Sequence, residues 1–546
     1  MKRTFHPVQF GGALLAALLL TACGGSRPFV PPPQVPDDRV PVPAPEYRSI
    51  DIPADVVEKQ FFDQIEQMLD FSRGFRKLTG NPKEAYNVDA FDEVPNSSWY
   101  TNRHHRTRMS LDAIVRGPNE GQAGPNPDVN WTITKVKAEG VTPGFNIRDA
   151  EGGEYVIKFE PVGYAEMPSG AEVIGTKLFH AAGFNVPQNY VVYFRPDILE
   201  IEEGLTFVDD RGRDRLFNRD DLAALLRRVE PQPDGRIRVA ASKLIKAKKF
   251  LGPFRYRSTR KDDPNDFIPH QHRRELRGLR VIAAWLNHYD TKDNNTLDIY
   301  SHDGYVKHYL IDFGSTLGSQ GDEPMPPFVG NENAFDPHQV AINTVTLGLY
   351  VRPWERNWRI IHPSIGFFTS ENFHPQKFKF ILPNPAFEAM TDRDGFWGAK
   401  IVMSFRDEEL AAIVGEARYS DPEATAYMVR TLQERRDIVG RYWFNRVNPL
   451  DRFVLDGGTV RFEDLAVSSG LMAAEGRRYR ASINGAPATE LQDLVIVLPA
   501  DAPAPSTGQW EIAIETRRGD GHWMDPVRVY LDRDGSSGWR LIGVRR

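Results

Sequence analysis

The sequence has little of three things that define common protein classes. Cys23 is the single cysteine among 546 residues, so no disulfide can form within the chain and no site built from several thiolates can bind a metal. Basic residues do not outnumber acidic ones, and the net charge of −6 argues against a general nucleic-acid binder, which needs a basic surface. Beyond residue 48, no apolar run is long enough to span a bilayer. We therefore expect ordinary globular domains, and the chain length allows two to four of them.

The first 22 residues have the pattern of an export signal. Two basic residues precede the apolar run FGGALLAALLL, which is too short to cross a bilayer comfortably. The run leads into LTAC, which ends at Cys23 and resembles the lipobox of bacterial lipoproteins. The resemblance implies cleavage before Cys23 and attachment of lipid to this residue. An ordinary export signal with a chance cysteine is the alternative.

The lipobox resemblance also implies a location. Residue 24 is Gly, not the aspartate that retains some lipoproteins at the inner membrane. We expect a chain that is lipid-anchored to the membrane through Cys23 in the bacterial cell envelope, at the outer membrane, on its periplasmic side or surface. Residues 23–48 are rich in proline and predict an extended tether that rises about 3.1 Å per residue and holds the folded part away from the membrane.

Changes in composition divide the rest of the chain into four parts. Residues 49–130 form an N-terminal extension that is turn-rich and contains an amphipathic helix over 56–76. Strand-rich sequence fills 131–265, helix-rich sequence fills 266–445, and short strands fill 446–546. These patterns predict an α+β fold that ends in a β-sandwich-like domain.

Alternating side chains predict three strands in the strand-rich part. They cover 131–137, 153–161 and 189–194. A helix is predicted over 171–182, with Gly183 as its C-terminal stop. The charged stretch 196–268 is interpreted as an insertion with helices over 220–228 and 242–250.

A polar octapeptide, HYDTKDNN, follows a strongly predicted helix that begins at residue 273. Two β-rich runs come next, separated by Asp303-Gly304, a favoured two-residue hairpin turn. A hairpin centred there pairs Asn295 with Asp312 at its open end, and Asp290 lies on the approach to the same end. An amide oxygen and a carboxylate make a hard-oxygen site suited to Mg²⁺.

Three motifs, in order, resemble those of the protein-kinase family. HYDTKDNN resembles the catalytic loop H-R-D-x-K-x-x-N, DFG at 312–314 resembles the magnesium loop, and VIK at 156–158 resembles the strand with the phosphate-binding lysine. The resemblance covers about residues 131–440 and implies a two-lobed kinase-like core, with 131–265 as the N-lobe and 266–445 as the helical C-lobe. HipA-type and spore-coat CotH-type atypical kinases are the groups it resembles most.

The resemblance implies that one set of residues binds the nucleotide. Lys158 would hold its phosphates, and Glu172, with Glu166 as runner-up, would pair with Lys158. Gly140 and Gly144, in EGVTPGF, would let the backbone approach the phosphates. This loop departs from the family's G-x-G-x-x-G.

A second set would carry the chemistry. Asp290 would orient the acceptor hydroxyl and accept its proton, and Lys292 would neutralise the phosphoryl group in transfer. Asn295 and Asp312 would hold metal ions. The implied cofactors are Mg²⁺ or Mn²⁺ with ATP or another phosphate donor, and the implied reaction is phosphoryl or nucleotidyl transfer to an acceptor that the sequence does not identify.

Other features of the sequence depart from the kinase family or favour a different function. Tyr289 replaces the family's arginine, which implies no control by activation-loop phosphorylation, and no A-P-E signature follows DFG. A periplasmic location is poor in ATP and favours a catalytically inactive binding module for an envelope polymer or protein partner. A metallohydrolase site that combines Asp290, Asp293 and Asp312 with His302 or His308 is a further alternative.

Overall fold

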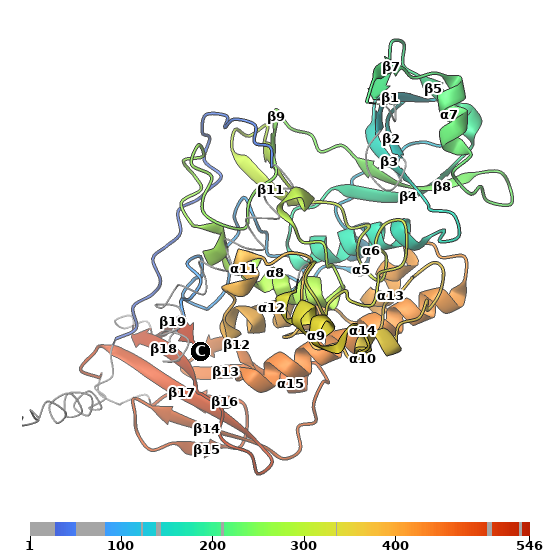
Figure 1. The fold of residues 1–546 in the computed structure, drawn as a ribbon. Helices are drawn as coiled ribbons and strands as arrows, with labels where there is room; N and C mark the ends of the chain where they lie inside the picture. The colour runs from blue at the N-terminus through green and yellow to red at the C-terminus, as the bar shows by residue number, and fades with distance from the viewer. Residues whose placement is uncertain are drawn as a thin grey trace, which may run out of the picture.

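The computed structural model describes residues 28–50, 82–121, 124–137, 144–208, 212–334, 336–499, 505–533 and 538–546. Figure 1 shows a helical body with a β-rich part at each end, the first in blue-green and the second in red. The predicted export signal with Cys23, the predicted helix over 56–76 and Gly140 lie outside the described residues. Across the described ranges, no helix has the length and apolar character needed to cross a membrane.

The first β-rich part is a six-stranded sheet. Its strands are β1 (Trp131–Lys137), β2 (Gly144–Asp149), β3 (Glu154–Phe159), β4 (Gln188–Phe194), β5 (Leu199–Ile201) and β8 (Ile237–Lys243). Their order is β4-β8-β3-β2-β1-β5, and all neighbours are antiparallel except the pair β1–β5. The three predicted strands are confirmed as β1, β3 and β4, and Tyr155, Ile157 and Phe159 on one face of β3 are buried as their alternation predicts.

Strand β8 corrects the predicted insertion over 196–268. It runs between β3 and β4 and bonds to both, with its first five residues buried. The predicted helix over 242–250 is also wrong, because β8 continues to Lys243 and β9 (Lys249–Gly252) begins soon after. Pairing on both edges of β8 outweighs the helical propensity of this lysine-rich stretch.

The remainder of this segment is peripheral, as expected of an insertion. Strands β6 (Thr206–Val208) and β7 (Asp214–Leu216) pair as a small hairpin, and α7 (Arg219–Leu226) confirms the predicted helix near 220–228. Asn218 caps α7, since its side chain accepts from the N–H groups of Asp220 and Asp221.

Helix α6 (Met167–Ala182) joins the sheet to the helical body. It packs against β4 and β8, and nearly all its residues are buried. Gly183 ends it with a φ of 116°, a left-handed conformation that favours glycine. Burial on all sides is typical of a helix enclosed between two layers rather than one at a surface.

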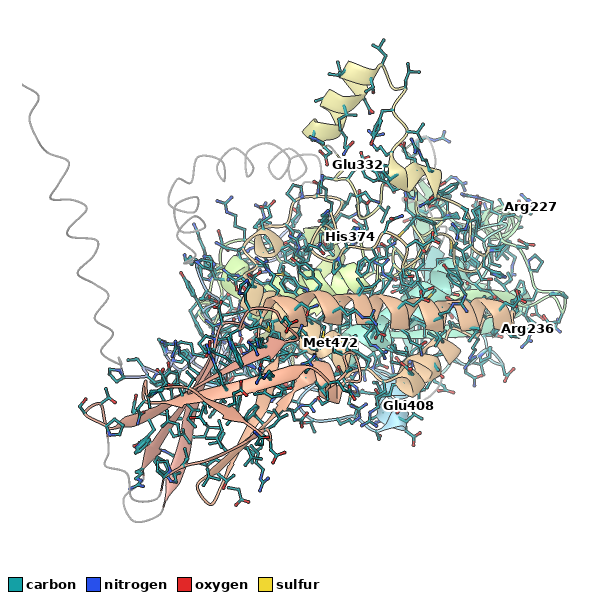
Figure 2. All side chains as sticks on the ribbon, turned by 90° about the horizontal axis from the view of Figure 1, so that it is seen from below. Arg227, Arg236, Glu332, His374, Glu408 and Met472 are labelled. Atoms are coloured by element: carbon teal, nitrogen blue, oxygen red, sulfur yellow. The ribbon has the colours of Figure 1, made fainter. Side chains whose placement is uncertain are left out.

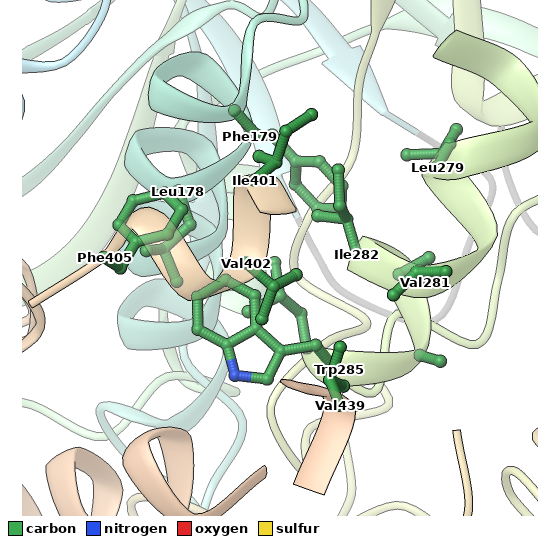
Figure 3. Packing of buried hydrophobic residues seen from close by; sticks show 14 of the residues in the cluster. Leu178, Phe179, Leu279, Val281, Ile282, Trp285, Ile401, Val402, Phe405 and Val439 are labelled. Carbon is green, nitrogen blue, oxygen red and sulfur yellow. The ribbon is translucent and has the colours of Figure 1, made fainter. Parts of the chain in front are cut away.

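The helical body follows in chain order. Its helices are α8 (Arg274–Trp285), α9 (Pro337–Thr346), α10 (Pro353–Arg356), α11 (Pro385–Glu388), α12 (Asp392–Ser404), α13 (Asp407–Gly415) and α14 (Pro422–Arg446), and the short α5 (Leu111–Arg116) lies beside α13 and α6. Figure 3 shows the centre of their core, where Phe179 of α6 lies with Ile282 and Trp285 of α8 and with Val402 of α12. Because α6 shares this core, apolar packing fixes its position against the body, at roughly 1.5–3 kcal/mol for each large side chain.

The hairpin after the polar octapeptide differs from its prediction by one residue. Strands β10 (Thr296–Tyr300) and β11 (Val306–Leu310) pair antiparallel, with β9 on the other edge of β10. Thr296 faces Leu310, and the turn has three residues rather than two. Gly304 adopts a φ of 87° in this turn, which accommodates the third residue.

The corrected register changes which residue faces Asn295. The N–H of Ile311 donates to the carbonyl of Asn295 at 3.0 Å, so Asn295 faces Ile311 and not Asp312. Asp312 is the next residue and leaves the hairpin with a φ of 65°.

The second β-rich part consists of two sheets around one core. One sheet contains β12 (Leu450–Asp456), β13 (Thr459–Asp464) and β16 (Val495–Val497), with α15 (Leu465–Ser468) after β13. The other contains β14 (Arg477–Ile483), β15 (Thr489–Leu491), β17 (Gln509–Arg518), β18 (Val527–Arg533) and β19 (Trp539–Arg545). Apolar side chains from both sheets form a single cluster, which agrees with the predicted β-sandwich-like domain.

Residues 28–50, which we call the strap, lie along the folded body rather than standing apart as the predicted tether would. Its first end is bound to the C-terminal domain. The N–H of Phe29 donates to Gln509 Oε1 at 2.6 Å, Gln509 Nε2 donates back to the Phe29 carbonyl at 3.1 Å, and the Phe29 ring stacks on Tyr530.

The other end of the strap is bound to the β9–β10–β11 sheet. The N–H of Val42 donates to the carbonyl of Gly304, and the N–H of Arg48 donates to the carbonyl of Leu251. An extended proline-rich chain has no internal hydrogen bonds, so its free backbone groups are available to such loop and strand edges. The strap therefore connects the C-terminal domain to the β9–β10–β11 sheet, and the blue trace in Figure 1 follows this path.

Candidate active site

Lys158 on β3 forms two ion pairs. Its Nζ lies 3.0 Å from Glu172 Oε2 and 2.8 Å from Asp312 Oδ1. Burial alone would lower the pKa of Lys158, but the charges of Asp312 and Glu172 raise it above its usual value, so the ammonium remains charged. The Glu172 side chain is 2% exposed and that of Asp312 is 52% exposed. Lys158 thus links a buried carboxylate to one that faces solvent.

Glu172 on α6 is held from three directions. Besides Lys158, it accepts a hydrogen bond from Asn189 Nδ2 at 2.8 Å and one from the N–H of Phe313 at 3.3 Å, both to Oε1. One carboxylate therefore joins β3, β4, α6 and the DFG segment. Sequence reasoning missed Asn189, although a lone amide within the apolar run NYVVYF is a usable signal.

The structure places Glu172, and not the runner-up Glu166, beside Lys158. Glu166 lies just before α6 with a φ of 72°. Its carboxylate accepts hydrogen bonds from Ser364 Oγ at 3.1 Å and from the N–H of Ser420 at 2.9 Å. Glu166 therefore connects α6 to loops of the helical body.

The octapeptide forms a tightly bonded loop around Asp290. Lys292 Nζ donates to Asp290 Oδ2 at 2.9 Å, and Asn295 Nδ2 donates to the Asp290 carbonyl at 2.7 Å. Asp290 Oδ1 is buried and has no hydrogen-bond partner among the described residues. A buried carboxylate oxygen without a donor is unfavourable, and the hydroxyl of a bound molecule could satisfy it.

The DFG segment is positioned by aromatic packing. The Phe313 ring stacks on Phe179 of α6 at 4.9 Å between centroids, and His288 packs against both rings. Burial lowers the pKa of His288, so this histidine is a neutral packing residue at pH 7. A Cβ at Gly175 would lie 3.0 Å from Phe313 Cβ, which explains a glycine at this crossing of α6 and the DFG segment.

Two further residues singled out in the sequence have structural explanations. Gly144 pairs with Lys158 across β2 and β3, and a Cβ there would meet the Ile157 carbonyl oxygen at 2.5 Å. Tyr289 is buried against Met325 and Val329, in the segment that follows DFG. Apolar packing thus accounts for a tyrosine at this position.

The metallohydrolase alternative finds no support in the arrangement of these side chains. His308 bonds to Asp298 at 2.6 Å and stacks on Trp99, while His302 lies in the hairpin turn. Within the described part of the chain, no three His, Cys, Asp or Glu side chains are grouped so that they could hold a metal ion.

No protein-family model and no curated protein matches this sequence. Among solved structures, the chain is similar to the crystal structure of CtkA, a Helicobacter pylori proinflammatory kinase, with a TM-score of 0.31 and 11% identity over 58% of this chain and 98% of that one. It is also similar to the Golgi casein kinase with Mn/ADP bound, with a TM-score of 0.28 and 10% identity over 65% of this chain and 79% of that one. Because these TM-scores are low, the function proposed below rests on the sequence motifs and the side-chain geometry of this chain.

Proposed function

We propose that this chain is a phosphotransferase of the protein-kinase type, anchored in the bacterial envelope, which uses a divalent metal ion and a nucleotide. One observation carries the proposal: Lys158 joins the buried Glu172 to the exposed Asp312. Residues from β3, α6 and the loop after β11 meet there, and Asp312 is 154 residues away from Lys158 in the sequence. A lysine fixed by a buried carboxylate is ready to bind phosphate oxygens.

The residues present fit a divalent ion bound together with phosphates. Mg²⁺ prefers one or two protein oxygens and takes its other ligands from phosphate and water. Asp312, which is half-exposed, and Asn295 supply hard oxygens of this kind. When bound, the metal and nucleotide would supply an activated phosphoryl group whose charge the metal partly neutralises.

The chain's own residues then do the remaining work. Asp290 would offer its unpartnered Oδ1 to the acceptor hydroxyl and accept its proton as the hydroxyl oxygen attacks the phosphorus of the donor. The bond from that phosphorus to the bridging oxygen would break, and the rest of the donor would leave with the negative charge. Lys292, 2.9 Å from the other oxygen of Asp290, keeps that carboxylate in place and places a positive charge beside the transferred group. The Asn295 side chain fixes the backbone of Asp290 and so its orientation.

The proposal also includes the location of the protein in the cell envelope and its kinship with particular groups of kinases. The lipobox at Cys23 supports lipid anchoring at the outer membrane, and the order of motifs supports kinship with HipA-type and CotH-type kinases. A compartment poor in ATP favours a different phosphate donor or nucleotidyl transfer by the same residues. An acceptor with a free hydroxyl group satisfies either reaction.

A thermal-shift experiment tests the nucleotide site. The chain from Ser26 is melted with and without ATP plus Mg²⁺ or Mn²⁺, alongside Asp312→Ala and the control Asp303→Ala, an exposed aspartate in the hairpin turn. A hundredfold excess over Kd should add about 2.7 kcal/mol, or a shift of about 2–4 °C. We expect a metal-dependent shift that D303A keeps and D312A loses.

A second variant separates an enzyme from an inactive binding module. Asp290→Asn should keep the nucleotide-dependent shift and lose phosphate transfer to any acceptor. No shift with any nucleotide or metal would overturn the nucleotide proposal. A shift without transfer in the unmodified chain, across acceptors taken from the envelope, would leave the chain as a binding module.

A further inference from the structure

A segment beyond the DFG loop stands out by its composition. Residues 340–351, which we call the apolar arm, read VAINTVTLGLYV and contain no charged residue. They form the larger part of α9 and the turn that leads toward α10. Figure 2 shows α9 projecting from the helical body beyond the labelled Glu332.

The apolar side chains of the arm are exposed to solvent. Val345, Leu347 and Leu349 are 84%, 84% and 83% exposed, and no residue from 340 to 351 is buried. Large apolar side chains scattered singly over a surface are ordinary, but a contiguous group at the end of a projection marks an interaction site.

A polar clamp holds the arm out from the body. Arg352, which is buried, donates from Nε to Gln339 Oε1 and from Nη2 to Asn343 Oδ1, each at 2.8 Å. Its guanidinium also lies 3.1 Å from Glu332 Oε1, on the segment that leads into α9. These bonds join the two ends of the arm to each other and to Glu332, so the projection is a defined part of the fold.

Several polar groups of the arm are hydrogen-bonded within the arm, and the side chain of Asn343 is hydrogen-bonded to Arg352. The hydroxyls of Thr344 and Thr346 donate to the carbonyls of Val340 and Ile342, both at 2.8 Å. The N–H groups of Leu347, Gly348 and Leu349 donate to the carbonyls of Thr344, Asn343 and Thr346. A segment that enters an apolar medium must satisfy its polar groups in this way, because no water is available there.

Residues typical of a membrane interface lie where the arm meets the body. Tyr350 and Trp358 are 45% and 38% exposed, and Arg356 and Arg359 are exposed beside them. Aromatic rings with a polar edge and arginines are enriched at the level of lipid headgroups, below which apolar side chains enter the hydrocarbon.

We propose that the apolar arm inserts into the surface of a lipid bilayer. A groove on another protein would cover one face of the arm, whereas residues 340–351 are exposed or half-buried at every position. A bilayer surrounds an inserted segment and covers all its faces, and the internally satisfied polar groups suit that surrounding. The inserted arm orients the helical body at the membrane and acts independently of any lipid on Cys23.

The test uses the chain from residue 23 onward with Cys23→Ser, which contains every described residue and no cysteine. Leu347→Cys, labelled with a polarity-sensitive dye, is mixed with vesicles of phosphatidylethanolamine and phosphatidylglycerol. Leu216→Cys is the matched control, because Leu216 is 62% exposed on β7, outside the arm. We expect a blue shift at position 347 that quenchers placed on the lipid acyl chains abolish, and no shift at position 216.

A second pair of variants tests whether the arm carries the binding. Leu347→Asp with Leu349→Asp should reduce vesicle co-sedimentation on the order of a hundredfold, since two leucines no longer enter the hydrocarbon. Leu216→Asp should leave it unchanged. Leu216, Leu347 and Leu349 are all exposed, so none of these changes should alter the melting temperature. Measuring the melting temperature of each variant therefore controls for a folding defect.

Two outcomes would overturn the proposal. The first is an unshifted dye at position 347 in the presence of vesicles. The second is concentration-dependent self-association that the double aspartate variant abolishes while vesicle binding is absent, because the arm would then cover a second copy of the chain.

Discussion

Two lysines in this molecule each lie between a glutamate and an aspartate, yet their surroundings differ. Lys158 bridges Glu172 and Asp312, and Lys400 on α12 bridges Glu93 and Asp451. The Lys158 side chain is 31% exposed, whereas the Lys400 side chain is 7% exposed. The carboxylates raise the pKa of both lysines against the effect of burial. The two sites contain the same residue types and differ in how far the lysine is exposed to solvent. The partly exposed Lys158 can exchange a carboxylate partner for a bound ligand, whereas the buried Lys400 stabilises the fold.

The largest difference between the two lysines is expected in the rate of phosphate transfer. Lys158→Met should lower the rate of phosphate transfer by at least about 10²-fold, since it removes a charge aimed at the phosphates. Lys400→Met should leave the rate per folded molecule unchanged. Transfer of labelled phosphate, corrected for the folded fraction, measures both, and equal losses would remove the distinction.

The free energy of unfolding should be affected in the reverse order, with the larger loss in the Lys400 variant. Lys400→Met leaves the buried Glu93 without its lysine partner and leaves Asp451 with Arg546 alone, which should lower the free energy of unfolding by about 3–5 kcal/mol. Lys158→Met should lower it by less, because Asp312 remains hydrated and the buried Glu172 keeps its hydrogen bonds from Asn189 and from the N–H of Phe313. Urea unfolding of the two variants gives the comparison, and a greater loss in K158M would contradict it.

Acid should weaken the Lys400 cluster in particular. His105 lies 3.3 Å from Glu93, and burial together with the charge of Lys400 lowers its pKa to about 3. An unfolded histidine has a pKa of about 6.5, so the unfolded chain alone binds this proton as the pH falls from about 6.5 to 3, and stability is lost across that window.

The variant His105→Gln isolates this contribution. It should reduce the loss of unfolding free energy between pH 7 and pH 5 by on the order of 1–2 kcal/mol. Burial raises the pKa of Glu93, which acts in the opposite direction and is present in both proteins. Urea unfolding at the two pH values measures the difference, and an unchanged pH dependence would show that His105 does not titrate below its usual range.

The smallest effect is expected for the exposed carboxylate. Asp312→Asn should change the free energy of unfolding by no more than about 1 kcal/mol, because the side chain is half-exposed and surface ion pairs contribute little. Asp451→Asn is the matched change at the buried cluster and should cost more. Thermal melts of both variants provide the measurement, and a larger loss for D312N would mean that the Lys158 site also supports the fold.

Local sequence patterns correctly predicted those helices and strands whose formation depends on the periodicity of their own residues. Helix α6 and its Gly183 stop, strands β1, β3 and β4, and the approach of Lys158 to Glu172 follow from periodicity or from the kinase resemblance. The hairpin register failed by one residue because the turn type depends on the φ of Gly304, which Asp-Gly alone does not determine.

Features that depend on contacts between distant parts of the chain could not be predicted from local sequence patterns. Strand β8 was assigned to an insertion because its role depends on pairing with β3 and β4, which come earlier in the chain. The Lys400 cluster joins residues 93, 400 and 451, and no local motif connects them. The strap was read as a free tether because composition indicates extension but not the surface along which an extended chain lies.

The strap also determines how the molecule responds to mechanical load. A force applied to the chain ahead of residue 28 acts first on the paired hydrogen bonds between Phe29 and Gln509 and on the Phe29–Tyr530 stack. The C-terminal domain therefore takes the load, while the Lys158 site lies on elements beyond the far end of the strap. Pulling at the N-terminal side should detach the strap from the C-terminal domain well before it deforms the candidate active site.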